Sequence, residues 1–181
     1  MGTLTFILGG ARSGKSRYAL QAVKTLQQPV TFIATATAGD DEMRERIANH
    51  QAERPADWQT VEAPTQIAKQ LANLEKLHPV VILDCITLLA SNILMMFDDP
   101  ENVEISAYLR AIDEEIKPLM QYIQTSEADW YVISNEVGLG LVPPYKMGRD
   151  YRDGLGRANQ HIAAQADRVI LMVAGIPMVV K

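Results

Sequence analysis

The stretch Gly9-Gly10-Ala11-Arg12-Ser13-Gly14-Lys15-Ser16 decides the fold of this chain. It follows an apolar run at residues 3–8, which predicts a first strand, and it precedes a helical pattern at residues 16–26. The eight residues match the phosphate-binding pattern G-x-x-x-x-G-K-[ST] at every specified position. Its glycines let backbone N–H groups turn inward, and the positive end of the following helix faces the same anion. We therefore expect a P-loop that binds a nucleotide triphosphate, with Lys15 on the β and γ phosphates and Ser16 on Mg²⁺.

A second residue of this site is expected at the end of a buried strand. Residues 80–84 are too apolar to face water on either side, and Asp84 is the only charged residue between Val80 and Phe97. A carboxylate at the end of a strand beside a P-loop can hold Mg²⁺. An ordinary strand-end cap is the alternative. We expect Ser16 and Asp84 to form the magnesium site, and we interpret Cys85 as a small buried residue.

Strand and helix patterns alternate along the rest of the chain. Pro118 is expected to kink or interrupt the long helical stripe at 109–123. Further strands are expected at 29–35, 130–134 and 168–181, the last turning back at 174–177, and helices from residue 40 or 41 to His50 and at 65–77, 86–97 and 153–166. The pattern predicts an α/β fold, a mainly parallel sheet with helices on both faces and a C-terminal β-hairpin. With 181 residues we expect a single nucleotide-binding domain, residues 1–181.

Composition excludes several classes of function. A formal net charge of −5 gives no basic footprint, so we expect no nucleic-acid partner. The apolar stretches 80–97 and 169–180 are broken by polar residues or by glycine and proline, and no basic region precedes an apolar run at the N-terminus. We therefore expect no membrane span and no signal peptide. The single cysteine rules out an internal disulfide, and the predicted location is the cytoplasm.

The P-loop alone leaves the reaction open among kinases, ATPases and nucleotidyl transferases. The guanine-specific pattern Asn-Lys-x-Asp is absent from the sequence. Residues 153–156 imitate the pattern D-x-x-G, but they open an expected helix instead of ending an apolar strand, so we discard the match. His50 is the residue that could separate these classes, because a neutral imidazole can attack phosphorus. From its spacing alone, on a helix face with Met43 and Ile47, a half-buried packing histidine is the preferred interpretation.

Several further blocks of sequence carry a resemblance to a known family. The chain resembles the bifunctional adenosylcobinamide kinase/adenosylcobinamide-phosphate guanylyltransferases of cobalamin synthesis from its first strand to its last. Besides the P-loop, the matching blocks are RYA at 17–19, FIATA at 32–36, DDEM at 40–43, RIANH at 46–50, RPADW at 54–58, DCIT at 84–87, NEVG at 135–138, YRD at 151–153 and GRANQ at 156–160. Some relatives carry a second histidine at the position of Asn49, and some carry glutamate at the position of Asp84.

The resemblance implies a two-step activity. The enzyme would first phosphorylate the aminopropanol hydroxyl of adenosylcobinamide with ATP or GTP. His50 would then take GMP from GTP as a covalent intermediate, releasing pyrophosphate, and pass it to adenosylcobinamide phosphate. Lys15 would act with His50 as a catalytic residue by neutralising phosphate charge.

The resemblance also implies a RecA-like P-loop fold, a homotrimer and a set of nucleotide contacts. Glu136, Arg149 and Arg157 are candidates for the corrinoid or its phosphate, with ordinary surface ion pairs as the alternative. The implied nucleotide contacts are Gly9, Gly10, Ala11, Arg12, Ser13, Gly14, Lys15, Ser16, Ala34, Thr35, Ala36, Gln51, Ala52, Glu53, Arg54, Glu62 and Asp84.

Two other functions stay open beside the bifunctional enzyme. One is a single-function P-loop small-molecule kinase in which His50 takes no part. The other is a nucleotide-dependent ATPase or switch module that acts on a protein partner. Only the bifunctional enzyme would form a covalent GMP adduct.

Overall fold

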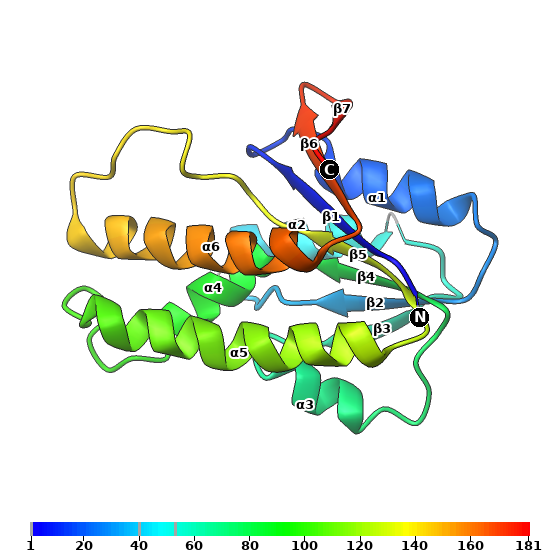
Figure 1. The fold of residues 1–181 in the computed structure, drawn as a ribbon, viewed down its shortest axis with the longest axis horizontal. Helices are drawn as coiled ribbons and strands as arrows, with labels where there is room; N and C mark the ends of the chain where they lie inside the picture. Colours follow the sequence, from blue (N-terminus) through cyan, green and yellow to red (C-terminus); the bar gives the residue numbers. More distant parts are fainter. Residues whose placement is uncertain (1, 40, 53) are drawn as a thin grey trace.

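The fold is a mainly parallel sheet, seen in a computed structural model that describes residues 2–39, 41–52 and 54–181 (Figure 1). In these ranges seven strands pair in the order β3-β2-β4-β5-β1-β6-β7, and only β7 runs antiparallel to its neighbour. The strands are β1 (Leu4–Gly9), β2 (Val30–Ala34), β3 (Gln59–Glu62), β4 (Val80–Asp84), β5 (Asp129–Ile133), β6 (Arg168–Val173) and β7 (Ile176–Val179). The helices are α1 (Lys15–Lys24), α2 (Asp41–Ala52), α3 (Ile67–Ala72), α4 (Ile86–Leu94), α5 (Ile105–Thr125) and α6 (Lys146–Gln165).

Helices cover both faces of the sheet, as the sequence predicts (Figure 1). α3, α4, α5 and α6 pack on one face and α1 on the other. Within β4, Val81 and Leu83 belong to the first core, whereas Val80 and Ile82 belong to the second. Alternate residues of a strand face opposite sides, so a strand that is covered on both faces is apolar throughout. The predicted α/β fold with a C-terminal hairpin, β6–β7, is thereby confirmed.

Two features of the sheet's β3 side differ from the predictions. β3 is not predicted by the sequence, because every second residue of this short edge strand is exposed and the strand has no apolar run. The helix expected at 65–77 forms only over Ile67–Ala72. It starts late because Gln66 adopts a left-handed conformation, and the Glu115 carboxylate accepts the N–H groups of Gln66 and Ile67 at 2.7 and 2.8 Å.

The two long helices also differ from the predictions. α5 runs through Pro118 without interruption, because Pro118 and Glu114 are exposed and the carbonyl that proline frees can bind water. α6 begins seven residues before the predicted start at Asp153, and Lys146 pairs with Asp150 one turn later, Nζ to Oδ2 at 2.5 Å. Residues 153–156 therefore lie inside α6 and do not open it. In the described ranges neither these helices nor the others are long and apolar enough to cross a membrane.

Gly154 lets α6 pack closely against α5. A Cβ added at Gly154 would lie 2.2 Å from Cε1 of Tyr108. The Tyr108 side chain is completely buried, and its hydroxyl donates to the carbonyl of Ala90 at 2.9 Å. Tyr108 therefore joins α4, α5 and α6, and its ring cannot move aside without losing that hydrogen bond.

We expect Gly154→Ala to lower the free energy of unfolding by about 1–3 kcal/mol, the usual cost of an overpacked core. The loss should outweigh a gain of about 1 kcal/mol in helix propensity. Gly156→Ala is the matched control, because an added Cβ there meets no described atom within 4 Å, and we expect it to be neutral or stabilising. Urea unfolding of the two variants measures both effects. Wild-type stability in Gly154→Ala would show that the Tyr108 packing is looser than described.

Candidate active site

The P-loop joins β1 to α1 and is backed by the β6–β7 turn. A Cβ at Gly9 would lie 2.6 Å from the carbonyl oxygen of Met172 in β6, so only glycine fits. Gly14 has φ 94°, and its Cβ would approach the Cα of Gly175 to 3.3 Å. The N–H of Gly175 donates to the carbonyl of Ser13 at 3.0 Å. The β6–β7 hairpin therefore packs directly against the back of the P-loop. This close contact explains why Gly9 and Gly14 have no side chain.

Lys15 lies in the concave side of this loop. It is the first residue of α1, and its side chain is buried. Its ammonium donates to the carbonyl of Gly10 at 2.6 Å and to Oγ of Ser13 at 3.5 Å. A buried ammonium at a helix N-terminus makes this position strongly favourable for an anion.

Ser16 and Asp84 come together as the sequence predicts. β4 ends at Asp84, two strands from the P-loop strand, with β5 between them. The Ser16 hydroxyl donates to Oδ2 of Asp84 at 2.9 Å. A hydroxyl and a carboxylate are oxygen ligands of the kind that Mg²⁺ prefers, and Mg²⁺ usually needs only one or two of them besides phosphate and water. The two residues fit a magnesium site, although the described residues hold no cluster of three or more acidic, histidine or cysteine ligands.

A cavity of ≈ 420 Å³ opens in front of the P-loop and brings most of the predicted nucleotide contacts together. It lies at the carboxyl ends of the parallel strands, where ligands bind in open α/β sheets. Its lining includes Ala11, Arg12, Ser13, Gly14, Lys15, Ser16, Ala34, Ala36, Gln51, Arg54, Glu62 and Asp84.

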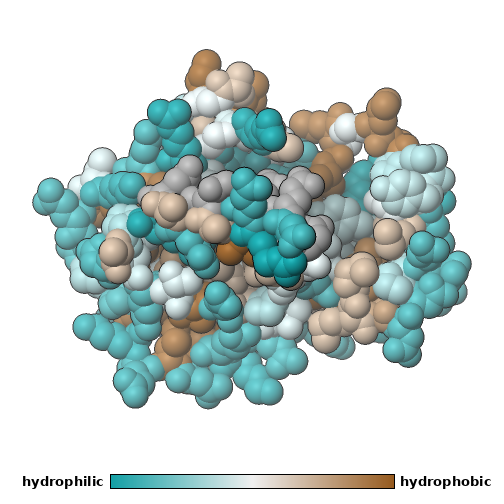
Figure 2. Space-filling view, turned by 180° about the vertical axis from the view of Figure 1, so that it is seen from behind, coloured by the Kyte–Doolittle hydropathy of each residue, from teal (hydrophilic) through white to brown (hydrophobic). Residues whose placement is uncertain are grey.

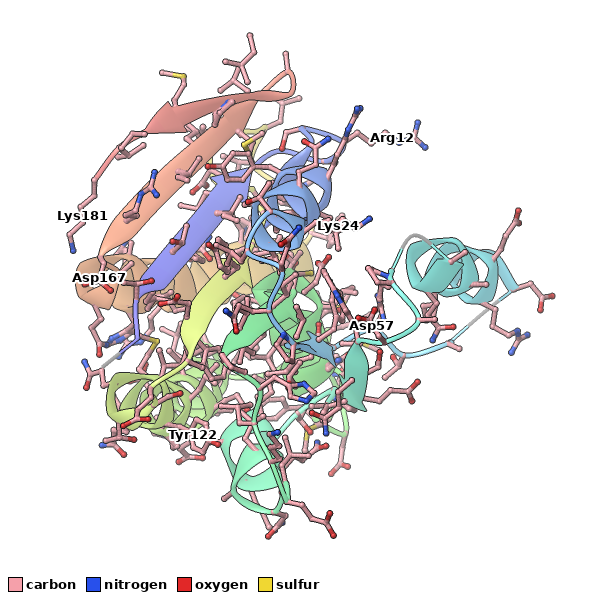
Figure 3. All side chains as sticks on the ribbon, turned by 90° about the vertical axis from the view of Figure 1, so that its right-hand side faces the viewer. Arg12, Lys24, Asp57, Tyr122, Asp167 and Lys181 are labelled. Carbon is pink, nitrogen blue, oxygen red and sulfur yellow. The ribbon has the colours of Figure 1, made fainter. Side chains whose placement is uncertain are left out.

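Helix α2 contributes to this cavity although it stands apart from the sheet, on the side where Arg12 lies (Figure 3). Ile47 and Gln51, four residues apart and so on one face of α2, both line the cavity. His50 belongs to the same helix, but its side chain lies outside the part of the chain that the structure describes.

Arg54 places a cationic donor in the cavity. Its guanidinium carbon lies 3.6 Å from the centroid of the Phe32 ring. Its Nη1 is buried and finds no hydrogen-bond partner in the described ranges. Burial lowers the pKa of Arg54, while the nearby Asp84 and Glu62 carboxylates act in the opposite direction. The group still carries its charge, and a buried cationic donor of this kind fits a phosphate oxygen.

Polar groups after β5 complete the wall of the cavity. The Asn135 N–H donates to Oγ1 of Thr87 at 2.7 Å, and the Asn135 carbonyl accepts from Nδ2 of Asn159 at 3.0 Å. The Ser134 hydroxyl in turn donates to Oδ1 of Asn159 at 2.7 Å. Asn135 was not predicted as a site residue, although it lies two residues after the end of β5, close to the position that Asp84 has at the end of β4. The other lining residues without a predicted role are Arg17, Ile47, Cys85, Thr87, Leu88 and Ile133.

Some predicted contacts do not line the cavity. Gly9 and Gly10 shape the loop, and Ala52 lies on an exposed part of α2. Thr35 is fully buried, and its hydroxyl donates to the Cys85 carbonyl at 2.7 Å and accepts from the Cys85 N–H at 2.8 Å. It therefore fastens β2 to the start of α4. Glu53 lies outside the described residues.

Cys85 adjoins Asp84 at the floor of the cavity. Burial and the neighbouring carboxylate raise the pKa of its thiol to about 12. The thiol is therefore protonated near neutral pH and is a poor nucleophile. Cys85 is small and packs against the core as expected, but it is half-buried and lines the cavity instead of being fully buried.

The three candidate corrinoid residues lie away from the nucleotide cavity. Arg157 forms a fork with Asp113, with Nε to Oδ1 at 2.7 Å and Nη2 to Oδ2 at 2.6 Å, and these bonds hold the pKa of Asp113 well below its usual range. Arg149 donates to two backbone carbonyls of the loop before α6. Glu136 accepts the N–H of Gly138 at 2.7 Å. Of the three candidates, only Arg157 therefore forms the surface ion pair that was the predicted alternative, and its partner is Asp113. Arg149 and Glu136 make the backbone contacts described above.

Comparisons with known sequences point to one family. A family model described as cobinamide kinase / cobinamide phosphate guanyltransferase matches residues 5–180. The bifunctional adenosylcobalamin biosynthesis protein CobU of Salmonella typhimurium is 40% identical in an alignment of 185 positions that covers 98% of this chain and 99% of the relative. The bifunctional adenosylcobalamin biosynthesis protein CobP of Pseudomonas aeruginosa is 41% identical over 175 residues, which are 97% of this chain and 95% of the relative.

Comparisons with solved structures bear on the fold. A protein of Pyrococcus horikoshii OT3, solved in a structural study project, aligns with a TM-score of 0.53 at 10% identity over 99% of this chain and 86% of its own. The RadB recombinase aligns with a TM-score of 0.48 at 15% identity over 94% of this chain and 74% of its own. At such identities, the first likeness concerns the arrangement of the sheet and helices alone.

Proposed function

The chain belongs to the cobinamide kinase / cobinamide phosphate guanyltransferase family, and from that premise we propose that it phosphorylates adenosylcobinamide with ATP or GTP and then transfers GMP from GTP through a covalent histidine intermediate. Its relatives are bifunctional enzymes, and this chain is one too. The observation that carries the proposal is a single cavity in which the P-loop, the Ser16–Asp84 pair and Arg54 meet beside the helix of His50.

In the first reaction, the aminopropanol hydroxyl oxygen attacks the γ-phosphorus. The bond from that phosphorus to the β–γ bridging oxygen breaks, the nucleoside diphosphate leaves, and the hydroxyl proton passes to solvent. The protein has little covalent chemistry to perform, so positioning and electrostatics supply most of the catalysis. The Lys15 ammonium and the Arg54 guanidinium lie in the same cavity and would neutralise the phosphate charge.

Ser16 and Asp84 would hold Mg²⁺ in this reaction. When bound, the ion would screen the negative charge of the β and γ phosphates. The contribution of the chain is to place a hydroxyl and a carboxylate 2.9 Å apart at the start of α1 and the end of β4. The backbone N–H groups of the P-loop bind the phosphates independently of these two side chains.

In the second reaction, an imidazole nitrogen of His50 attacks the α-phosphorus of GTP, and pyrophosphate leaves as the bond to the β-phosphate oxygen breaks. A phosphate oxygen of adenosylcobinamide phosphate then attacks the same phosphorus, and the P–N bond breaks to regenerate the imidazole. The position of His50 supports this role, since it follows Ile47 by three residues and precedes Gln51, and both line the cavity.

The products of a single incubation test the function. Protein given adenosylcobinamide, Mg²⁺ and GTP should release both GDP, from the kinase reaction, and pyrophosphate, from the guanylyl transfer. The corrinoid should end as adenosylcobinamide-GDP. Release of a nucleoside diphosphate without pyrophosphate, with the corrinoid left as its phosphate, would instead identify a single-function kinase.

Asp84→Asn should lower Mg²⁺-dependent turnover by about 10- to 100-fold while leaving the Kd for nucleotide within a few-fold. The carboxylate acts on the metal ion, whereas the P-loop backbone still holds the phosphates. The asparagine oxygen can still accept from Ser16, so the fold should survive. Asp98→Asn, in an exposed loop, is the matched control. Turnover and binding that fell together would show that Asp84 acts structurally.

We also propose that the enzyme is a homotrimer, as its family resemblance implies. Two exposed apolar segments support association with other copies of the chain. They are the β6–β7 hairpin and the loop before α6, both brown in Figure 2. Ile176 is 66% exposed and Leu141 is 96% exposed. Monomers rarely leave such apolar segments uncovered. Light scattering should give three times the monomer mass of 20.1 kDa, and a mass near 20.1 kDa would contradict the trimer.

A further inference from the structure

A second groove, of ≈ 600 Å³, runs along α6 beside the loop that follows β5. Arg152, Gly156 and Gln160 line it at four-residue intervals along one face of α6, and Asp153 and Arg157 line it too. Glu136, from the loop after β5, also lines the groove. None of these residues lines the nucleotide cavity.

The groove and the nucleotide cavity share a wall. Asn135 lines the cavity, and the next residue, Glu136, lines the groove. The Glu136 N–H donates to the carbonyl of Gly9, the first residue of the P-loop, at 3.1 Å. Asn159 lines the groove and donates to the Asn135 carbonyl. In Figure 1 this segment leaves the end of β5 and continues into the yellow loop that returns to α6.

The polar groups of the groove are mixed in sign and in hydrogen-bonding character. Glu136 and Asp153 offer acceptors, Arg152 and Arg157 offer donors, and the Gln160 amide offers both. The fork with Asp113 fixes the orientation of the Arg157 guanidinium. Two carboxylates make the groove unsuitable for a bare phosphate, whereas primary amides, each with two N–H donors and one carbonyl acceptor, match such a lining.

We propose that this groove binds the amide-bearing rim of the corrinoid acceptor, an inference that rests on the proposed function. Cobinamide carries several neutral amide side chains around its ring, and its reacting hydroxyl lies at the end of a flexible aminopropanol arm. A ring that is held in the groove can therefore send this arm across the shared wall to the γ-phosphate. In this proposal the groove binds the corrinoid acceptor, and the cavity binds the nucleotide.

Gly156→Trp tests the proposal, because a side chain added at Gly156 has open space and would fill the groove. We expect the KM for adenosylcobinamide to rise about tenfold or more, since each 1.4 kcal/mol of lost binding is a factor of ten. The KM for GTP, and the covalent labelling by α-phosphate-labelled GTP without corrinoid, should stay at wild-type values. Gly156→Ala, which adds one methyl group, is the matched control and should keep the wild-type KM for the corrinoid.

Gln160→Leu is a second variant, which keeps the assay decisive if Gly156→Trp does not fold. Gln160 is exposed, so its replacement should be tolerated, and the loss of its amide should also raise the corrinoid KM. Folded variants with wild-type corrinoid KM overturn the groove proposal while the function stands. A change in oligomeric mass in Gly156→Trp would show that a second copy of the chain occupies the groove, and this also overturns the proposal. Wild-type protein that neither labels nor phosphorylates the corrinoid overturns the groove and the function together.

Discussion

Replacing Lys15 by Ala should abolish both kinase and guanylyltransferase activity, with losses on the order of 100- to 1000-fold in each. The Lys15 ammonium is buried inside the loop, where it bonds the Gly10 carbonyl at 2.6 Å. There it can neutralise charge on a bound triphosphate in a setting where water does not screen it. Both reactions consume a nucleoside triphosphate, and we expect both to use this one loop. The rate of GDP release with adenosylcobinamide, and the rate of pyrophosphate release with supplied adenosylcobinamide phosphate, measure the two losses separately.

Lys24→Ala is the matched control, because Lys24 lies on the same helix but does not line the cavity. It should keep both activities. Thermal unfolding of Lys15→Ala should show that the loop variant is folded. Normal guanylyl transfer in that variant, with the kinase activity lost, would mean that the protein has two nucleotide sites, and the single-site account would be wrong.

Replacing His50 by Ala should eliminate GMP transfer and covalent labelling while leaving the kinase reaction largely intact. Kinase chemistry moves the γ-phosphoryl group directly to a substrate hydroxyl and needs no protein nucleophile. Guanylyl transfer through an adduct requires an imidazole nitrogen at the α-phosphorus, and alanine at this position cannot supply one. Two measurements separate the effects. The α-phosphate label that the protein retains from GTP reports the adduct, and the rate of corrinoid phosphorylation reports the kinase reaction.

His161→Ala is the matched control for His50. His161 lies on α6, where its Nε2 is 3.4 Å from Oδ1 of Asp113, and it lines neither the nucleotide cavity nor the groove. This variant should still label. If folded His50→Ala loses both reactions, His50 positions the nucleotide for both steps and its role is not limited to the adduct.

The sequence predicts those parts of the site whose geometry is local. The P-loop glycines, Lys15 and Ser16 act through backbone conformation and the start of one helix, so eight consecutive residues are enough to identify them. Asp84 stands out in the sequence because a lone charge that ends a buried apolar strand is costly unless a cation or a hydrogen-bond donor satisfies it. β4, between Val80 and Asp84, has the predicted bounds because its apolar run is unbroken and ends at this charge.

Other features depend on contacts between distant segments, and the sequence does not show them. Arg54 lies in one of the sequence blocks that carry the family resemblance. No sequence pattern shows that its Nη1 is buried without a hydrogen-bond partner in the described ranges, or that its side chain lies over Phe32. Asn135 enters the cavity through its bond to Thr87, 48 residues away. The contact between Gly154 and Tyr108 joins α6 to α5, and the apolar pattern of each helix does not show which other helix it packs against.

The measurement that tests the central claim most directly uses GTP labelled at different phosphates. Wild-type protein incubated with α-phosphate-labelled GTP and Mg²⁺, then denatured, should retain the label, whereas γ-phosphate-labelled GTP should leave none. The adduct would be a phosphoramidate, so the label should survive alkali and be lost in mild acid, and peptide mapping should place it on His50. Protein that retains no α-label, or an α-label that is stable in acid, would contradict the covalent histidine mechanism.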